Sequence, residues 1–428
     1  MPLRPARRRT VGVLAALALA LCAPPAAAPP LPAATSTAAT STAPPAPAAA
    51  ATTAGETPAP TDDAGSADAT VDAADTAYLR ERAAAAVADL PVAQQAASIV
   101  MGHIGGTDPA ALAAYMQAGF GGFILMGANI PGTDAELHAL TDALAVDPTL
   151  PPLIAVDQEG GLVSRLDGDV FPASTTLKDR PVADTSAAFA ARGALVARAG
   201  ITVNFGTVAD VTADSGSFIF GRALGADPSG AAERVAAATS AQQPFVASAL
   251  KHFPGHGAAP GDSHHAIPTT GRSLEEWKTT DAVPFAAGID AGASLLMYGH
   301  LAYTAVDPLP ASLSATWHTL ARDELGFDGV SVTDDLGMLL SSGDPAYADP
   351  VANGVAAVAA GNDLVLMVAG SDAQTAGRMA AGIAAAVDAG TLPAERLADA
   401  ATRVLALRMQ LAGSTATWGV CDTCTPAG

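Results

Sequence analysis

Ionisable residues stand at the ends of several apolar runs in this chain. Four such runs end in side chains that can move protons, attack as nucleophiles or bind polar ligands: Asp157 and Glu159, Lys251 and His252, His300, and Asp334 with Asp335. A single charge after an apolar run is common, but several at the same end of a fold indicate a polar ligand site. We therefore expect these segments to meet around one pocket.

The Asp334-Asp335 pair has a structural and a chemical interpretation. An aspartate after a strand often caps the following helix, and it can also act as a carboxylate nucleophile. Because successive residues of a strand point to opposite sides, only one of the two can face a pocket at the end of the strand. The alternation alone does not say which one.

The segment from Lys251 to His264 holds a second candidate pair. Asp262 lies two residues before His264, where it can accept the ring N–H and hold one tautomer, as suits a general acid/base. A solvated loop that happens to contain a histidine is the plain alternative. Metal binding is a third reading, because several histidines lie nearby, but their spacing matches no standard metal pattern and Lys251 would repel a cation. We expect no metal.

Eight apolar runs alternate with Ala-rich segments of helical length. The runs are 99–101, 122–126, 153–156, 201–204, 246–250, 294–297, 330–333 and 364–367, and the helical segments include 107–118, 134–145, 185–199, 229–243, 313–325 and 371–388. Runs that are apolar throughout are typical of parallel strands buried on both faces. Eight such units predict an α/β fold, a single-domain (β/α)8 TIM-type barrel with its site at the carboxyl ends of the strands. A doubly wound sheet is the alternative, but no Gly-x-Gly-x-x-Gly turn opens a helix after the first run.

The motifs at the ends of the runs resemble those of a known family. Lys251-His252-Phe253-Pro254-Gly255-His256-Gly257 followed by Asp262-Ser263-His264 resembles the signature of glycoside hydrolase family 3, and more narrowly that of its bacterial β-N-acetylglucosaminidases of the peptidoglycan-recycling type. Three further segments resemble other motifs of the family: Asp157-Gln158-Glu159-Gly160-Gly161 with Arg165, Gly221-Arg222-Ala223-Leu224-Gly225-Ala226-Asp227-Pro228, and Thr333-Asp334-Asp335-Leu336 with Met338. Order and spacing agree over about 340 residues.

This resemblance implies a role for each matching residue. Asp334 is expected to be the nucleophile of a retaining glycosidase, and His264, with Asp262 as its partner, the acid/base on a loop that is mobile in relatives. The expected substrate-binding residues are Asp157, Arg165, Arg222, Lys251 and His252. The resemblance therefore implies an exo-β-N-acetylhexosaminidase that acts on peptidoglycan fragments or chitin oligosaccharides and needs no cofactor.

The chain departs from the family pattern at two points. Ala258-Ala259 follow the His-Gly where relatives often carry an acidic residue, so the conformation of this loop can differ. Few residues follow the last run, so we also expect the α/β sandwich domain of the two-domain members to be absent. This favours the single-domain N-acetylglucosaminidases over the family's typical β-glucosidases.

Other functions stay open at this stage. A phosphorylase, in which phosphate replaces water as acceptor, fits the same scaffold because a histidine does not repel phosphate as a carboxylate does. A β-glucosidase or β-xylosidase specificity is a third reading. A non-catalytic wall-sugar-binding protein is a fourth, and it would not need the set Asp334, Asp262 and His264.

The first 75 residues have the composition of an export signal followed by a tether. Residues 1–28, with four arginines before a short apolar run, are expected to be a signal peptide. Residues 29–75 are rich in Ala, Pro and Thr and read as a disordered linker. The barrel is then 76–414 and the tail 415–428. We expect a secreted or cell-wall-associated protein, with a lipid anchor at Cys22 as a minor alternative and a possible disulfide between Cys421 and Cys424.

The net charge of the chain limits the classes of molecule that it can bind. The formal net charge is −21, from 21 basic and 42 acidic residues. Such a surface repels phosphate backbones and anionic lipid headgroups, so we expect neither nucleic-acid binding nor membrane-surface binding. No run after the signal is long enough to span a bilayer. A neutral carbohydrate is the partner that fits best, and we expect a monomer.

Overall fold

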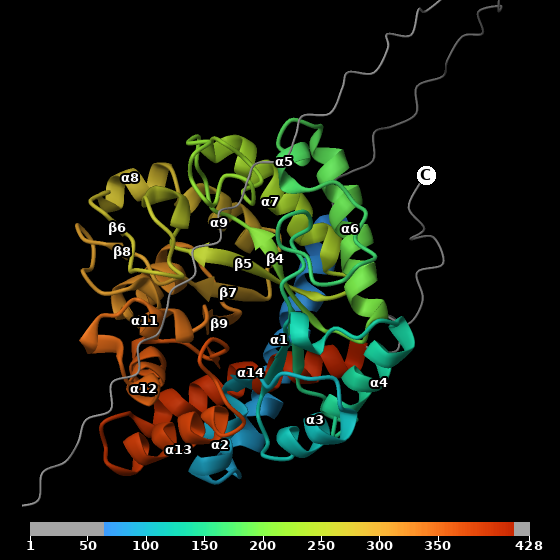
Figure 1. Ribbon diagram of the computed structural model, residues 1–428, viewed down its shortest axis with the longest axis vertical. Helices are drawn as coiled ribbons and strands as arrows, with labels where there is room; N and C mark the ends of the chain where they lie inside the picture. The colour runs from blue at the N-terminus through green and yellow to red at the C-terminus, as the bar shows by residue number, and fades with distance from the viewer. Residues whose placement is uncertain (1–63, 415–428) are drawn as a thin grey trace, which may run out of the picture. The chain divides into compact units, whose positions relative to one another are not determined.

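The computed structural model describes residues 64–414, and these residues form a parallel barrel wrapped by helices (Figure 1). The barrel strands are Val100–Gly102 (β1), Gly122–Leu125 (β2), Leu153–Val156 (β3), Val203–Val208 (β4), Ala247–Phe253 (β5), Leu295–Tyr298 (β7), Val330–Thr333 (β9) and Val365–Leu366 (β10). Their order is β10-β1-β2-β3-β4-β5-β7-β9, and every pairing is parallel. A parallel bridge between Val332 and Leu364 joins the two ends of this order. The predicted (β/α)8 barrel is confirmed.

The helices lie outside the ring of strands. The principal ones are Ala64–Ala88 (α1), Val92–Ser98 (α2), Pro109–Met116 (α3), Asp134–Leu144 (α4), Val182–Arg198 (α6), Pro228–Gln242 (α7), Ala282–Asp290 (α9), Pro350–Ala360 (α12), Thr375–Asp388 (α13) and Ala394–Ser414 (α14). Shorter helices are Ser174–Leu177 (α5), Leu274–Thr279 (α8), Ala315–Thr319 (α10) and Gly337–Ser341 (α11). A two-stranded piece, Thr269–Thr270 (β6) with Ala302–Tyr303 (β8), lies apart from the barrel sheet.

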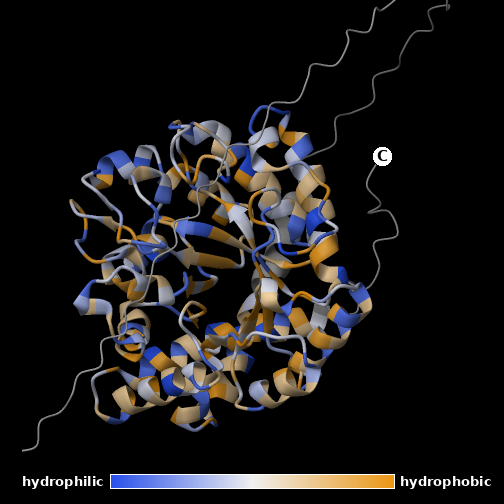
Figure 2. Cartoon of the chain, viewed as in Figure 1, coloured by the Kyte–Doolittle hydropathy of each residue, from blue (hydrophilic) through white to orange (hydrophobic). Residues whose placement is uncertain are grey.

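Local sequence signals explain where several helices begin. Thr133 accepts the amide N–H of Glu136 at the start of α4, and Asp227 accepts that of Gly230 at the start of α7, where Pro228 takes the first helical position. All barrel strands are buried along their length, as expected for strands covered on both faces. Figure 2 shows hydrophobic residues concentrated on the strands and on the helix faces turned toward them.

Two predicted boundaries differ from the structure. The helix α1 begins at Ala64, inside the segment expected to be a linker, and it lies beside α14 (Figure 1). The strand β4 continues to Val208, beyond the predicted end of the fourth run at 204. Gly206 and Thr207 interrupt the apolar pattern there, although both are buried, so a rule based on hydropathy ends the strand too early.

Several predictions fall outside the described residues. The signal peptide, the linker up to residue 63, Cys22, the tail and the pair Cys421 and Cys424 all belong to segments that the structure does not describe. Among the helices of residues 64–414, none has both the length and the apolar composition required to cross a bilayer.

Candidate active site

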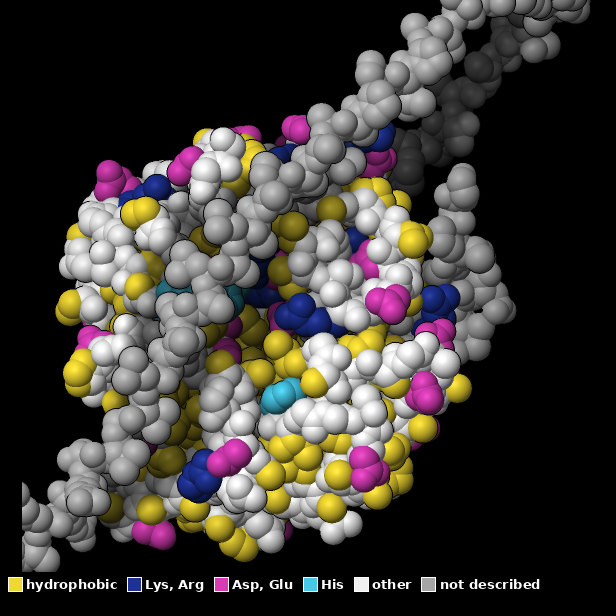
Figure 3. Space-filling view, in the orientation of Figure 1, with side chains coloured by type: hydrophobic (Ala, Val, Ile, Leu, Met, Phe, Trp, Pro, Cys, Tyr) yellow, Lys and Arg dark blue, Asp and Glu magenta, His cyan; other side chains and the backbone are white. Residues whose placement is uncertain are grey.

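A cavity of about 320 Å³ opens at the carboxyl ends of the barrel strands. Its apolar lining comes from the barrel interior and includes Ile124, Phe205, Met297 and Leu366. Figure 3 shows the hollow on this face, with hydrophobic walls and basic and acidic groups inside it. Three of the four ionisable segments singled out in the sequence converge here, since Asp157, Lys251 and Asp334 all line the same cavity. His300, from the fourth segment, does not line it, but its ring contacts the carbonyl oxygen of Asp335.

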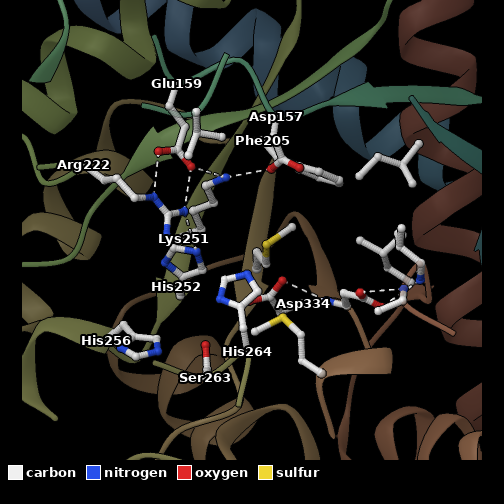
Figure 4. Close-up of a pocket in the computed structure, with 18 of the residues that line it drawn as sticks. Asp157, Glu159, Phe205, Arg222, Lys251, His252, His256, Ser263, His264 and Asp334 are labelled. Atoms are coloured by element: carbon white, nitrogen blue, oxygen red, sulfur yellow. Dashed lines mark hydrogen bonds and ion pairs between the residues drawn. The ribbon is translucent and has the colours of Figure 1, made fainter. Parts of the chain in front are cut away.

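One side of the cavity is a network of two cations and two carboxylates. The Lys251 ammonium lies 2.8 Å from Asp157 Oδ1 and 2.7 Å from Glu159 Oε1. Arg222 binds Glu159 through two N–H groups, with distances of 2.9 and 2.7 Å (Figure 4). Arg165 lies at the edge of this group, with its guanidinium 3.9 Å from Asp157. Such fixed donors and acceptors suit the hydroxyl groups of a sugar.

Glu159 is the centre of this network. Its side chain is 2% exposed, and burial by itself raises the pKa of a carboxyl group. The Lys251 ammonium and the Arg222 guanidinium outweigh that effect and lower the pKa of Glu159 to about 2. Burial likewise lowers the pKa of Lys251, but the carboxylates of Asp157 and Glu159 reverse this and raise it. Glu159 and Lys251 are therefore both charged near neutral pH.

His252 is held in a single tautomer between Arg222 and a second buried carboxylate. Arg222 Nη2, which can only donate, lies 3.2 Å from His252 Nε2, so this ring nitrogen accepts. Nδ1 then carries the hydrogen and donates it to Asp210 Oδ2 at 2.7 Å. Burial, assisted by the charge of Arg222, lowers the pKa of His252 well below its ordinary value. His252 is therefore a neutral ring with both nitrogens engaged.

The aspartate pair after β9 divides into two roles. Asp334 lines the cavity, and its Oδ1 accepts the amide N–H of Asp335 at 2.8 Å. Burial raises the pKa of Asp334, but the backbone N–H of Asp335 and the ammonium of Lys251 oppose this, and the pKa lies below its usual range. An ionised carboxylate that faces a cavity is available as a nucleophile.

Asp335 has a different task. Its carboxylate accepts backbone N–H groups from Gly337 at 2.8 Å, Val368 at 2.7 Å and Ala369 at 2.9 Å. Its own carbonyl accepts from His300 Nε2 at 2.8 Å. These contacts tie the loop after β9 to the loop after β10 and fix the amide that holds Asp334.

His264 stands on the loop after β5 and lines the same cavity (Figure 4). Its Nδ1 is 2.5 Å from Asp262 Oδ1, and the same oxygen accepts the His264 backbone N–H at 3.0 Å. Burial by itself raises the pKa of Asp262, but these two hydrogen bonds together outweigh it and lower the pKa. The side chains of His264 and Asp262 are 57% and 37% exposed, so the pair borders both the cavity and solvent.

The structure brings the sequence-predicted residues together. Seven of the eight line one cavity: Asp157, Arg165, Arg222, Lys251, His252, His264 and Asp334. Asp262 does not line it, but is bonded to His264. Within residues 64–414, no group of three or more His, Cys, Asp or Glu side chains is arranged to hold a metal ion.

Two residues that organise the site, Glu159 and Asp210, were given no role by the sequence analysis. Glu159 belongs to the motif that begins at Asp157, and its position just after a strand could have indicated that it lies in the site. Asp210 received no role because the fourth run seemed to end at Asn204, which hid the fact that this strand also ends in a carboxylate.

The chain was compared with known proteins. The family model of the glycosyl hydrolase family 3 N terminal domain matches residues 105–407. The chain is 40% identical over 257 residues to a β-hexosaminidase of Pseudomonas aeruginosa, covering 58% of this chain and 74% of that one. It resembles a family 3 β-N-acetylglucosaminidase from Paenibacillus, with a TM-score of 0.70, 30% identity and coverage of 79% and 65% of the two chains. A β-N-acetylhexosaminidase from Beutenbergia cavernae gives a TM-score of 0.66 and 31% identity, with coverage of 75% and 99%.

Proposed function

The chain belongs to glycosyl hydrolase family 3, and on this premise we propose that it is a retaining exo-β-N-acetylhexosaminidase. It removes terminal β-linked N-acetylglucosamine from glycans such as peptidoglycan fragments or chitin oligosaccharides. The observation that carries the proposal is the pairing, in one cavity, of an ionised Asp334 with a His264–Asp262 acid/base unit. The names of the β-hexosaminidase relatives support the choice of the N-acetyl sugar.

The first chemical step forms a covalent glycosyl-enzyme. Asp334 attacks the anomeric carbon while His264 gives a proton to the departing glycosidic oxygen. Asp262 stabilises the protonated ring of His264 and keeps it oriented. The proton ends on the leaving sugar, and the nucleophile becomes an ester.

The second step returns the enzyme to its starting state. Neutral His264 accepts a proton from a water molecule, which attacks the anomeric carbon and releases Asp334 as a carboxylate. Two inversions at the same carbon give net retention. Because His264 and Asp262 are partly exposed in this structure, closure of their loop over the sugar completes the site before each transfer.

The opposite side of the cavity binds the sugar. Lys251 and Arg222 are fixed by Glu159, which leaves their remaining N–H groups to donate to hydroxyl or acetamido oxygens. Asp157, which is 19% exposed, is placed to accept from a hydroxyl. A cavity of about 320 Å³ lies at the small end of the range for ligand pockets, as suits a single sugar unit and removal from a chain end.

We also propose that the protein acts outside the cytoplasm as a monomer. The support for export is the sequence of residues 1–28, in which arginines precede a short apolar run. An extracellular location gives access to wall or chitin fragments.

The test is hydrolysis of an aryl N-acetyl-β-glucosaminide beside the matching β-glucoside, with and without phosphate. We expect turnover of the N-acetyl sugar, independent of phosphate, with the β-anomer as the first product in NMR. Asp334→Ala should abolish it, whereas Asp399→Ala, which removes only surface ion pairs on α14, should not. Turnover that requires phosphate would identify a phosphorylase. Preference for the glucoside, or full activity of Asp334→Ala, would refute the proposal.

A further inference from the structure

Asp210 is a fully buried carboxylate that contacts two functional parts of the site without lining the cavity. It follows β4, and its side chain is 0% exposed. Its Oδ2 lies 2.7 Å from His252 Nδ1, and the backbone N–H of His252 is 3.2 Å from Oδ1. Its Oδ1 also accepts the backbone N–H of His256 at 2.6 Å. One side chain thus joins the end of β5 to the first residue of the short helix His256–Ala258 that follows it.

The contact with His252 controls the sugar-binding side. A carboxylate has only acceptors, so it keeps the hydrogen of the His252 ring on Nδ1. Only with that tautomer can Nε2 accept from Arg222 Nη2 at 3.2 Å. In the opposite tautomer, the Nε2–H of His252 would face an N–H of Arg222. This repulsion would displace the Arg222 guanidinium from its position against Glu159.

The contact with His256 controls the acid/base side. His256 opens the short helix His256–Ala258, which leads to Asp262 and His264. The next residue, Gly257, packs closely against the loop that follows β4, since a Cβ placed on Gly257 would clash with the carbonyl oxygen of Val211. The beginning of the loop is therefore anchored on the segment that carries Asp210, while its far end, with His264, remains partly exposed.

We propose that Asp210 is a positioning residue that couples the two halves of the reaction. Through His252 it sets Arg222 for the sugar, and through the His256 amide it anchors the loop that brings His264 to the glycosidic oxygen. This inference rests on the proposed function, since it assigns a residue to that same site.

The test compares two leaving groups with wild type and Asp210→Asn. The asparagine keeps the size and one acceptor but turns an N–H group toward His252 Nδ1. The value of kcat/KM reports on glycosyl-enzyme formation, and a 2,4-dinitrophenyl group leaves without a proton whereas a simple alkyl alcohol needs one from His264. We expect kcat/KM for the alkyl glycoside to fall about 10- to 100-fold, the usual range for losing a hydrogen bond to a charged group. The fall should be clearly smaller with dinitrophenyl.

The control is a buried aspartate at the other end of the barrel. Asp363, at 0% exposed, binds Ser331, Arg322 and Arg396 before β10, so Asp363→Asn removes comparable contacts away from the cavity. It should lower stability without changing the ratio of rates on the two leaving groups. If Asp210→Asn changes nothing in that ratio, or changes it no more than Asp363→Asn does, Asp210 is merely structural and the inference fails.

A second measurement uses the wild-type protein and does not depend on how well the variant folds. In ¹⁵N-histidine NMR, assigned with His252→Gln, the His252 ring should show a protonated Nδ1 and a bare Nε2 near neutral pH. A bare Nδ1 or a doubly protonated ring would overturn the inference. Absence of wild-type turnover would instead refute the proposed function, and the tautomer would still decide the role of Asp210.

Discussion

Replacing Glu159 by Gln is expected to remove a pH-dependent contribution to stability, and the size of this contribution can be calculated from the structure. Glu159 is 2% exposed and accepts from Lys251 at 2.7 Å and from Arg222 at 2.9 and 2.7 Å. Its pKa falls from an ordinary 4.5 to about 2 in the folded protein. At about 1.4 kcal/mol per pH unit, this difference corresponds to about 3 kcal/mol of folding free energy.

The sign follows from the direction of the pKa change. A depressed folded pKa means that ionised Glu159 stabilises the protein fully above about pH 4.5, and that this contribution disappears as pH falls toward 2. A glutamine cannot ionise, and it leaves Arg222 with one acceptor instead of two. The wild type should therefore exceed Glu159→Gln by about 3 kcal/mol at pH 7, within the range for breaking a buried ion pair, and the gap should narrow steadily below pH 4.5.

The assay is urea unfolding of both proteins at several pH values between 7 and 3, followed by tryptophan fluorescence. Glu324→Gln is the matched control, because Glu324 makes a largely exposed pair with Lys278 and should matter by less than about 1 kcal/mol at any pH. Equal stability of Glu159→Gln and wild type at pH 7 would refute the reasoning. So would a gap that stays constant down to pH 3.

Two further predictions concern the nucleophile and the absence of a metal. In Asp335→Asn, the side-chain NH2 group would face one of the three backbone N–H donors now bound by the carboxylate. The backbone N–H of residue 335, which holds the Asp334 carboxylate, should therefore shift. We expect kcat to fall about 10-fold or more while KM changes little. A change confined to KM in steady-state kinetics would contradict this. Dialysis against EDTA should leave activity unchanged, because Lys251 and Arg222 occupy the carboxylates that a divalent ion would need. Recovery of lost activity on adding Zn²⁺ or Mg²⁺ would show the opposite.

The barrel could be predicted because each strand carries its own signal. The run Leu153–Val156 is apolar on both faces, and every other strand contains apolar residues, so alternation with helices was enough to indicate the fold. The pairing of Asp262 with His264 was also predictable, because two residues so close in sequence meet whatever the rest of the chain does.

The missing parts of the site were those that depend on distant contacts. Glu159 and Arg222 lie 63 residues apart, and Asp210 and His252 lie 42 apart. No local pattern pairs them, since side chains of neighbouring parallel strands become adjacent only when the sheet sets their register. Asp210 was further hidden because β4 contains Gly206 and Thr207, which are buried but not apolar.

The sequence by itself determined the eight units, the family motifs and the residue types available for chemistry, because hydrophobic periodicity and motif order are properties of the chain. Only the tertiary structure decided how the paired residues divide their work. Both aspartates line the cavity, but the carboxylate of Asp335 is bound to the amides of Val368 and Ala369, a difference set by the approach of the loop after β10. The charges of Glu159 and Lys251 and the tautomer of His252 were likewise decided there, since burial and neighbouring charges exist only in the folded state.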